Sequence, residues 1–139
     1  MKINPYLNFG GHTEAAFNFY RSVFGGEFLN VNRFGENPDS TIPDPLKDKI
    51  MHITLPIDNS YLMGSDAPEE MGFTVQMGNN TYIMISPDSR EETKRVFEAL
   101  AAGGTVETDL QDMFWGDYYG SLTDKYGVQW MLNYSKTQH

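Results

Sequence analysis

An internal repeat is the feature of this sequence that most constrains its fold. Gly25-Gly26 and Gly103-Gly104 lie 78 residues apart, and each pair follows a segment whose apolar residues recur at helical spacing. Glycine adopts the left-handed conformation that ends a helix at little cost, so each pair predicts a helix end. A repeat of this length predicts two copies of one structural module.

The first half of the chain predicts one helix and four strands. The helix covers residues 13–24, and its apolar stripe consists of Ala16, Phe17, Tyr20, Val23 and Phe24. The expected strands cover residues 5–9, 27–34, 50–57 and 60–66. The stretch 35–49 holds three prolines and is expected to be an exposed loop without regular structure, either a lid or a surface excursion.

Alternation assigns side chains to the faces of two of these strands. In residues 50–57, one face is expected to carry Met51, Ile53, Leu55 and Ile57, and the other His52 and Thr54. In residues 60–66, one side is expected to carry Tyr61, Met63 and Ser65.

The second half repeats this order. Ser89, with Glu92 three residues later, has the spacing of a capping box and predicts a helix that ends at Gly103-Gly104. The expected strands cover residues 80–86, 105–110, 118–123 and 128–134, with a possible extra strand at 72–77. The fold class is therefore α+β: paired βαβββ modules that form a curved mixed sheet with the helices outside. We expect one domain, with modules at about 1–70 and 71–139.

Composition excludes several classes of function. The net charge is −9, so nucleic acid and membrane surfaces are poor partners. Cysteine is absent, which excludes disulfides, thiolate nucleophiles and thiolate zinc sites. The sequence has no long apolar run, no apolar leader and no glycine-rich phosphate or dinucleotide motif, so we expect a cytoplasmic protein.

Several segments resemble PhnB-like proteins of the vicinal oxygen chelate superfamily, which includes glyoxalase I, bleomycin-resistance proteins and extradiol dioxygenases. The resemblance is carried by PYLNF at 5–9, AAFNFY at 15–20, Met51-His52, MGSD at 63–66 and the segment 114–131. It covers nearly the whole chain, and it implies paired βαβββ modules, a homodimer and a pocket inside each curved sheet.

The resemblance also indicates where a metal site would lie. Metal-binding members carry His, Gln or Glu on the first and last strands of each module. Here those positions hold Pro5 or Tyr6, a residue near Tyr82, and then Tyr61, Met63, Ser65 and Met131. None of these is a good ligand for zinc, nickel or ferrous iron, so we predict no metal and no cofactor.

The candidate pocket residues are polar, aromatic and thioether side chains expected to face the cleft. They are His52, Met63, Tyr82, Met84, Phe114, Trp115, Tyr118, Met131 and Asn133. His52 is either a general base or ligand-binding group, or a histidine satisfied by Thr54. Alternation places only one of Tyr118 and Tyr119 in the cleft, and it assigns Trp130 to the core with Val128 and Leu132.

Three functions remain open, and no catalytic residue is assigned. The first is a metal-free homodimer that binds a small apolar or aromatic ligand. The second is a metal-dependent enzyme of glyoxalase or dioxygenase type, with His52 and carboxylates from Glu36, Asp66 or Asp117 as ligands. The third is a structural or regulatory dimer whose cleft is filled by its own side chains.

Overall fold

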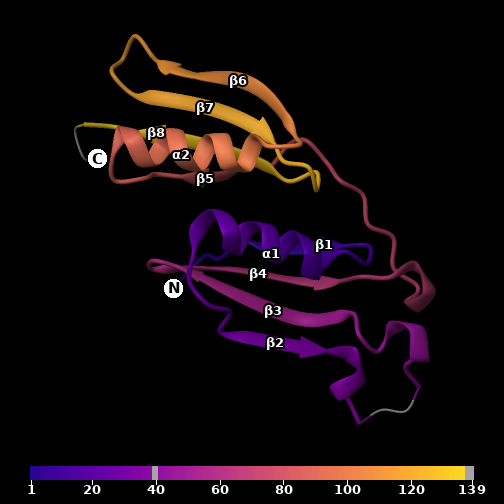
Figure 1. Ribbon diagram of the computed structural model, residues 1–139. Helices are drawn as coiled ribbons and strands as arrows, with labels where there is room; N and C mark the ends of the chain where they lie inside the picture. The colour runs from indigo at the N-terminus through magenta and orange to yellow at the C-terminus, as the bar shows by residue number, and fades with distance from the viewer. Residues whose placement is uncertain (39–40, 137–139) are drawn as a thin grey trace. The chain divides into compact units, whose positions relative to one another are not determined.

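The computed structural model describes residues 1–38 and 41–136, and the chain divides into two compact units, Met1–Gln76 and Met77–His139 (Figure 1). In each unit a strand, a helix and three further strands follow one another, as the repeat predicts. The chain as described therefore has two helices and eight strands in two mixed sheets. The extent of one domain over both units stays a prediction.

Unit 1, residues 1–76, builds a four-stranded sheet with one helix. Its elements are β1 (Tyr6–Phe9), α1 (Thr13–Phe24), β2 (Asn30–Arg33), β3 (Ile50–Ile57) and β4 (Ser60–Asp66), with short 3-10 helices η1 (Phe34–Glu36), η2 (Asp44–Leu46) and η3 (Glu69–Met71). The strand order is β1-β4-β3-β2, where β1 runs parallel to β4 and the other pairs are antiparallel.

Unit 2, residues 77–139, repeats this arrangement. Its elements are β5 (Ile83–Ile85), α2 (Arg90–Ala101), β6 (Thr105–Asp112), β7 (Tyr118–Thr123) and β8 (Gln129–Tyr134). The strand order is β5-β8-β7-β6, again with the first strand parallel to the last. No described helix has the length and apolar character needed to cross a membrane.

Each helix buries its apolar stripe against one face of its own sheet. The buried side chains of α1 are Thr13, Ala16, Phe17, Tyr20 and Val23, and those of α2 are Thr93, Val96, Phe97 and Leu100. The Ser89 hydroxyl oxygen accepts a hydrogen bond from the backbone N–H of Glu92 at 3.0 Å and so caps α2. Gly25 ends α1 with φ at +80°, which confirms the role predicted for that glycine pair.

A glycine lies beneath a helix phenylalanine in both cores. In unit 1, Gly64 on β4 is the register partner of Ile53 on β3, and a Cβ on Gly64 would lie 2.6 Å from Cε1 of Phe17. In unit 2, Gly120 on β7 is the partner of Leu132 on β8, and a Cβ there would lie 2.7 Å from Cε2 of Phe97. Each helix can therefore approach its sheet closely only because a glycine lies beneath it. This glycine is on the last strand in unit 1 and on the third strand in unit 2.

Several sequence expectations need correction. Residues 73–78 form no regular structure, so the extra strand at 72–77 is wrong. The 35–49 stretch, of which residues 39 and 40 lie outside the described part, contains η2 and most of η1, because Leu46 is buried and anchors it. The strand expected at 27–34 is reduced to β2.

A bulge in β3 overturns one face assignment. Asn32 pairs with His52 and Arg33 with Ile50, so the register skips Met51. An extra residue in one strand locally reverses the alternation of side chains. Ile50 therefore joins Ile53 and Leu55 in the core, whereas Met51 is 37% exposed and lies outside the apolar face expected for it.

Candidate functional site

The candidate site is the face of each sheet that its helix leaves uncovered. In unit 1, helix-facing Gly64 and Ile53 fix which residues point the other way. Strand register then brings eight side chains to that face, which we call the unit 1 face: Tyr6, Asn8, Asn30, Asn32, His52, Thr54, Met63 and Ser65.

His52 is held by hydrogen bonds at both ring nitrogens. Its Nδ1 lies 3.1 Å from the Tyr6 hydroxyl, and its Nε2 lies 2.8 Å from the Thr54 hydroxyl. The Tyr6 and His52 rings also pack at 5.7 Å between centroids. A neutral imidazole has one donor and one acceptor nitrogen, so these two hydroxyls use both of them. His52 is therefore oriented on the face and would lose a hydrogen bond if either nitrogen bound a metal.

Amide side chains surround this histidine. Asn8 accepts a hydrogen bond from the Ser65 hydroxyl at 3.0 Å through its carbonyl oxygen. Asn32 is the register partner of His52, and Asn30 is the partner of Thr54. Neither the Asn30 nor the Asn32 side chain has a hydrogen-bond partner within residues 1–38 and 41–136. Both amides therefore present a donor and an acceptor to whatever covers the face.

The corresponding unit 2 face carries two neighbouring methionines on β5 and β8. Met84 on β5 and Met131 on β8 are register partners, and alternation places Tyr82 and Asn133 on the same side. The full set that we call the unit 2 face is Tyr82, Met84, Thr108, Gln111, Tyr119, Ser121, Met131 and Asn133. Asn133 donates through Nδ2 to the Asp117 carboxylate at 3.0 Å.

The two faces share one layout. In each, a methionine on the last strand pairs with a residue of the first strand on one side and with a hydroxyl residue of the third strand on the other. For Met63 these neighbours are Tyr6 and Thr54. For Met131 they are Met84 and Ser121. The repeat thus extends from the order of elements to the chemistry of the exposed face.

Tyr118 does not lie on the unit 2 face, so its expected place in the pocket is wrong. It is 9% exposed, and the Arg90 guanidinium of α2 lies 3.9 Å from the centre of its ring, so Tyr118 belongs to the helix side. Tyr119 is the residue that pairs with Asn133 on the open side. Alternation alone left both residues open, and only the register of β7 with β8 distinguishes them.

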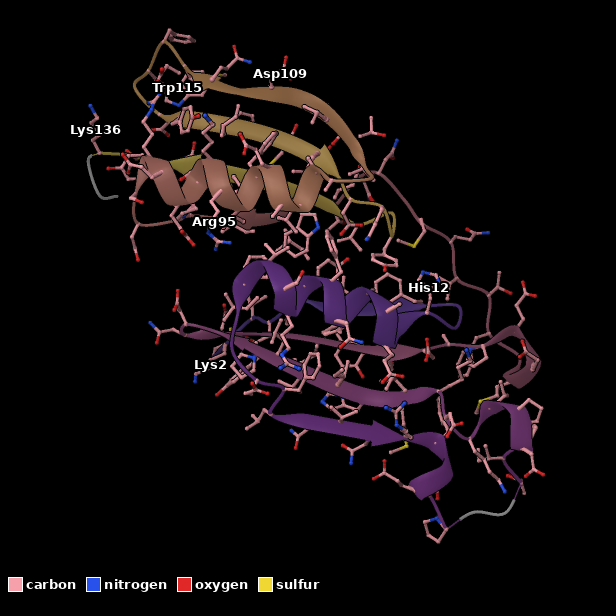
Figure 2. The ribbon with its side chains drawn as sticks, in the orientation of Figure 1. Lys2, His12, Arg95, Asp109, Trp115 and Lys136 are labelled. Atoms are coloured by element: carbon pink, nitrogen blue, oxygen red, sulfur yellow. The ribbon has the colours of Figure 1, made fainter. Side chains whose placement is uncertain are left out.

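Phe114 and Trp115 lie in the turn between β6 and β7 rather than on a strand (Figure 2, where Trp115 is labelled). Their rings pack edge to face at 4.9 Å, and they are 97% and 55% exposed. The turn is closed by hydrogen bonds from Met113 N–H to the Asp117 carbonyl and from Gly116 N–H to the Met113 carbonyl. Their contact with a ligand stays a prediction.

The two unit 1 carboxylates suggested as metal ligands, Asp66 and Glu36, bond to other groups. Asp66 is buried on the helix side of the unit 1 sheet, where it binds Thr13 and the Ile50 N–H. Glu36 accepts from the Arg33 N–H at 2.6 Å. Within residues 1–38 and 41–136, no group of three or more His, Asp and Glu side chains could hold a metal ion. The amide, hydroxyl and thioether side chains of the two faces are poor ligands for zinc, nickel or ferrous iron.

The Tyr82 phenol gives a test of the geometry of the unit 2 face. Its hydroxyl donates to both carboxylate oxygens of Glu107 at 3.1 Å, which links the side of β5 to β6. Desolvation raises the pKa of Tyr82 above 10.0, and the hydrogen bond and charge of Glu107 raise it further. The phenol therefore stabilises the fold in its neutral form, and this contribution is lost as pH rises through the raised pKa.

We expect Tyr82 to ionise at a higher pH than an ordinary tyrosine when its tyrosinate absorbance is followed above pH 9. Subtracting the absorbance titration of Tyr82→Phe from that of the wild type gives the titration of Tyr82 alone. Glu107→Gln removes the negative charge and should lower the pKa of Tyr82 toward its ordinary value. Identical Tyr82 titrations with and without Glu107→Gln would contradict the contact.

Comparison with known proteins places this geometry among relatives. The sequence profile of the 3-demethylubiquinone-9 3-methyltransferase family matches residues 1–133. Protein YjdN of Escherichia coli is 34% identical, with 99% of this chain and 98% of that protein covered.

Solved structures agree with this relationship. Protein PA1353 of Pseudomonas aeruginosa is 36% identical over 97% of this chain and 98% of its own, with a TM-score of 0.86. A PhnB protein of Bacillus cereus, described as a putative 3-demethylubiquinone-9 3-methyltransferase, is 29% identical over 97% and 100%, with a TM-score of 0.76. A glyoxalase/bleomycin resistance protein/dioxygenase family enzyme of Burkholderia phytofirmans shares the fold, at 21% identity over 93% and 95% and a TM-score of 0.62.

Proposed function

The chain belongs to the 3-demethylubiquinone-9 3-methyltransferase family, as a PhnB-like member of the glyoxalase/bleomycin-resistance/dioxygenase superfamily, and from this premise we propose that it binds a small, partly aromatic molecule without a metal ion. The observation that carries the proposal is the pair of register partners Met84 and Met131, side by side on β5 and β8 of the unit 2 face. Thioethers are flexible and polarisable, and they pack well against aromatic rings.

The residues around this pair support the same ligand class. Tyr82 and Tyr119 supply aromatic surface on the same side of the sheet, and Asn133 supplies a polar group held by Asp117. An apolar surface with a few fixed polar groups is typical of small-molecule sites. Phe114 and Trp115, exposed on the neighbouring turn of the same unit, are proposed to contact the ligand as well.

Methyl transfer is not part of the proposal, although the family description names it. Nucleotide-containing cofactors commonly bind at the carboxyl ends of parallel strands, at a switch point of a doubly wound sheet. Each sheet here has a single parallel pair, β1–β4 or β5–β8. The chemistry on the two open faces therefore supports binding better than transfer of a methyl group.

Two further parts of the proposal concern assembly and location. Each four-stranded sheet has two edge strands, β1 and β2 in unit 1 and β5 and β6 in unit 2. Such edges favour pairing with other strands and so support a homodimer. The cytoplasmic location expected from the sequence stays a proposal. Native mass spectrometry of protein purified without chelator reads subunit number, retained metal and retained organic ligand in one spectrum.

Binding can be tested with indole as an aromatic probe and methionine methyl groups as NMR reporters. Indole should shift the methyl signals of Met84 and Met131, and Met131→Ala should weaken its binding about tenfold, since about 1.4 kcal/mol of contact is lost. Met77→Ala is the control, because Met77 is a methionine of the same unit that lies outside the sheet.

Metal addition tests the other half of the proposal. A ligand that prefers the folded state raises Tm, so indole should raise it whereas Mn²⁺ and Zn²⁺ should leave it unchanged. A rise in Tm with one metal ion per chain in the native mass spectrum would favour the metal-dependent enzyme instead. Absence of any methyl shift with indole, on a folded protein, would favour a purely structural dimer.

A further inference from the structure

We infer that the unit 1 face binds a neutral ligand with neighbouring hydroxyl groups, such as a polyol or a sugar ring. The inference rests on the proposed function, because it names the chemistry recognised by one of the two open faces. It is carried by the side-chain amides of Asn30 and Asn32, which have no hydrogen-bond partner among the described residues and lie beside the Tyr6–His52–Thr54 hydrogen bonds.

The unit 1 face offers no counter-charge to an ion. None of its eight residues is Asp, Glu, Lys or Arg, although the chain has a net charge of −9. The cations nearest along the chain bind elsewhere: Arg33 donates to both Glu14 carboxylate oxygens on α1 at 2.6 and 2.9 Å, and Lys49 donates to the Gly11 carbonyl. An ion that loses water without gaining a partner is destabilised, so this face favours a neutral ligand.

The polar side chains of this face still offer both hydrogen-bond donors and hydrogen-bond acceptors. The side-chain amides of Asn30 and Asn32 each keep a donor NH₂ group and an acceptor oxygen, and Asn8 uses only its oxygen toward Ser65. A hydroxyl group likewise donates once and accepts, so neighbouring hydroxyls can bond an amide in both directions. Such a ligand replaces the hydrogen bonds that water makes to these exposed groups.

The register arranges these groups in two rows. Asn30 lies beside Thr54 in one row, and Asn32 lies beside His52 in the other. Adjacent strands are about 4.8 Å apart, and residues on one face of a strand repeat at about 6.8 Å. A six-membered ring with several hydroxyls can therefore reach side chains from both rows and both strands at once.

An aromatic surface borders the rows. Tyr6 is exposed beside Met63, and exposed Tyr61 lies two residues earlier on the same side of β4. The C–H face of a sugar ring packs on such rings, while its hydroxyls remain at the edge for hydrogen bonds. His52 is fixed by Tyr6 and Thr54, so this surface is ordered before the ligand arrives.

The unit 2 face does not offer the same chemistry despite its shared layout. Its amide Asn133 already donates to Asp117, and Tyr82 already donates to Glu107. These polar groups therefore already bond to carboxylates, and two methionines lie side by side on this face. This contrast assigns the hydroxyl-bearing ligand to unit 1 and the aromatic ligand to unit 2.

The test is an NMR titration of the full chain with myo-inositol and, separately, with methyl β-D-glucopyranoside. At least one should shift the side-chain amide signals of Asn30 and Asn32 with millimolar affinity. Asn32→Asp keeps the size of the side chain but replaces the donor by a charge, and it should weaken binding at least about tenfold. Asn18→Asp, on the exposed side of α1, is the matched control and should change the affinity by less than about twofold.

Asn30→Asp provides a second variant in case Asn32→Asp does not fold. No amide shift with either probe, or equal weakening by Asn18→Asp, overturns the inference. Indole in the same sample separates this outcome from the proposed function. Shifts of Met84 and Met131 with indole, without amide shifts from either polyol, would overturn only the inference, whereas the absence of every shift would overturn both.

Discussion

Replacing Asp66 by alanine should lower the free energy of unfolding by about 4 kcal/mol, because three donors lose a charged acceptor inside the core. The buried Asp66 carboxylate accepts from the Thr13 N–H at 3.0 Å, from the Thr13 hydroxyl at 2.7 Å and from the Ile50 N–H at 2.8 Å. It therefore ties the start of α1 to the start of β3, and alanine leaves all of these groups without their partner.

Urea denaturation followed by circular dichroism measures this loss. Asp109→Ala is the control, because Asp109 is an exposed aspartate on β6 (Figure 2) and surface changes usually stay within about 0.5 kcal/mol. Asp66→Asn should lie between the two, since it keeps one carbonyl oxygen but turns an amide group toward other donors. A loss below about 1 kcal/mol for Asp66→Ala would mean that the carboxylate does not join these elements.

Gly120→Ala should lower the free energy of unfolding by about 3 kcal/mol through overpacking of unit 2. The added Cβ would lie 2.7 Å from Cε2 of buried Phe97 and 3.0 Å from the Cα of Leu110 on the neighbouring strand. The ring cannot rotate away without leaving the core, and the Leu110 contact is with the backbone. Either α2 or β6 must therefore shift.

The matched control is Gly78→Ala, since the nearest atom to a Cβ there is Oδ1 of Asn80 at 3.7 Å. A double-mutant cycle with Phe97→Leu tests the mechanism, because the smaller side chain removes the ring that meets the new methyl group. The cost of Gly120→Ala should then fall by about half. An unchanged cost in the Phe97→Leu background would assign the strain to the Leu110 backbone alone.

The sequence predicts the elements best where periodicity is strong and a breaker follows. The helix at 13–24 and the strands at 50–57, 60–66 and 118–123 have the bounds found in the structure. Trp130 is buried as predicted, because its apolar partners alternate cleanly along β8. The strand expected at 72–77 failed, since a short apolar run without a partner strand does not form a sheet.

The sequence predicts the candidate site less well, because strand register decides which side of the sheet each side chain occupies. Met63, Met131 and Asn133 lie on the side that alternation predicts, since their strands are regular. Met51 does not, because pairing with β2 introduces a bulge that no local pattern shows. Asn30 and Asn32 were missed for a related reason: only their pairing with Thr54 and His52 brings them onto the open face.

The core glycine lies on the last strand in unit 1 and on the third strand in unit 2, so the corresponding strands of the two units cannot be exchanged freely. If β7 replaced β3 in unit 1, Gly120 would face Gly64, and the core would lose the branched side chain that Ile53 provides. If β3 replaced β7 in unit 2, Ile53 would face Leu132 beneath Phe97, where a glycine is needed. Exchanging β3 and β7 between the units should therefore destabilise both cores. Each core thus pairs one glycine with one branched side chain, and the two units place them on opposite strands of the pair.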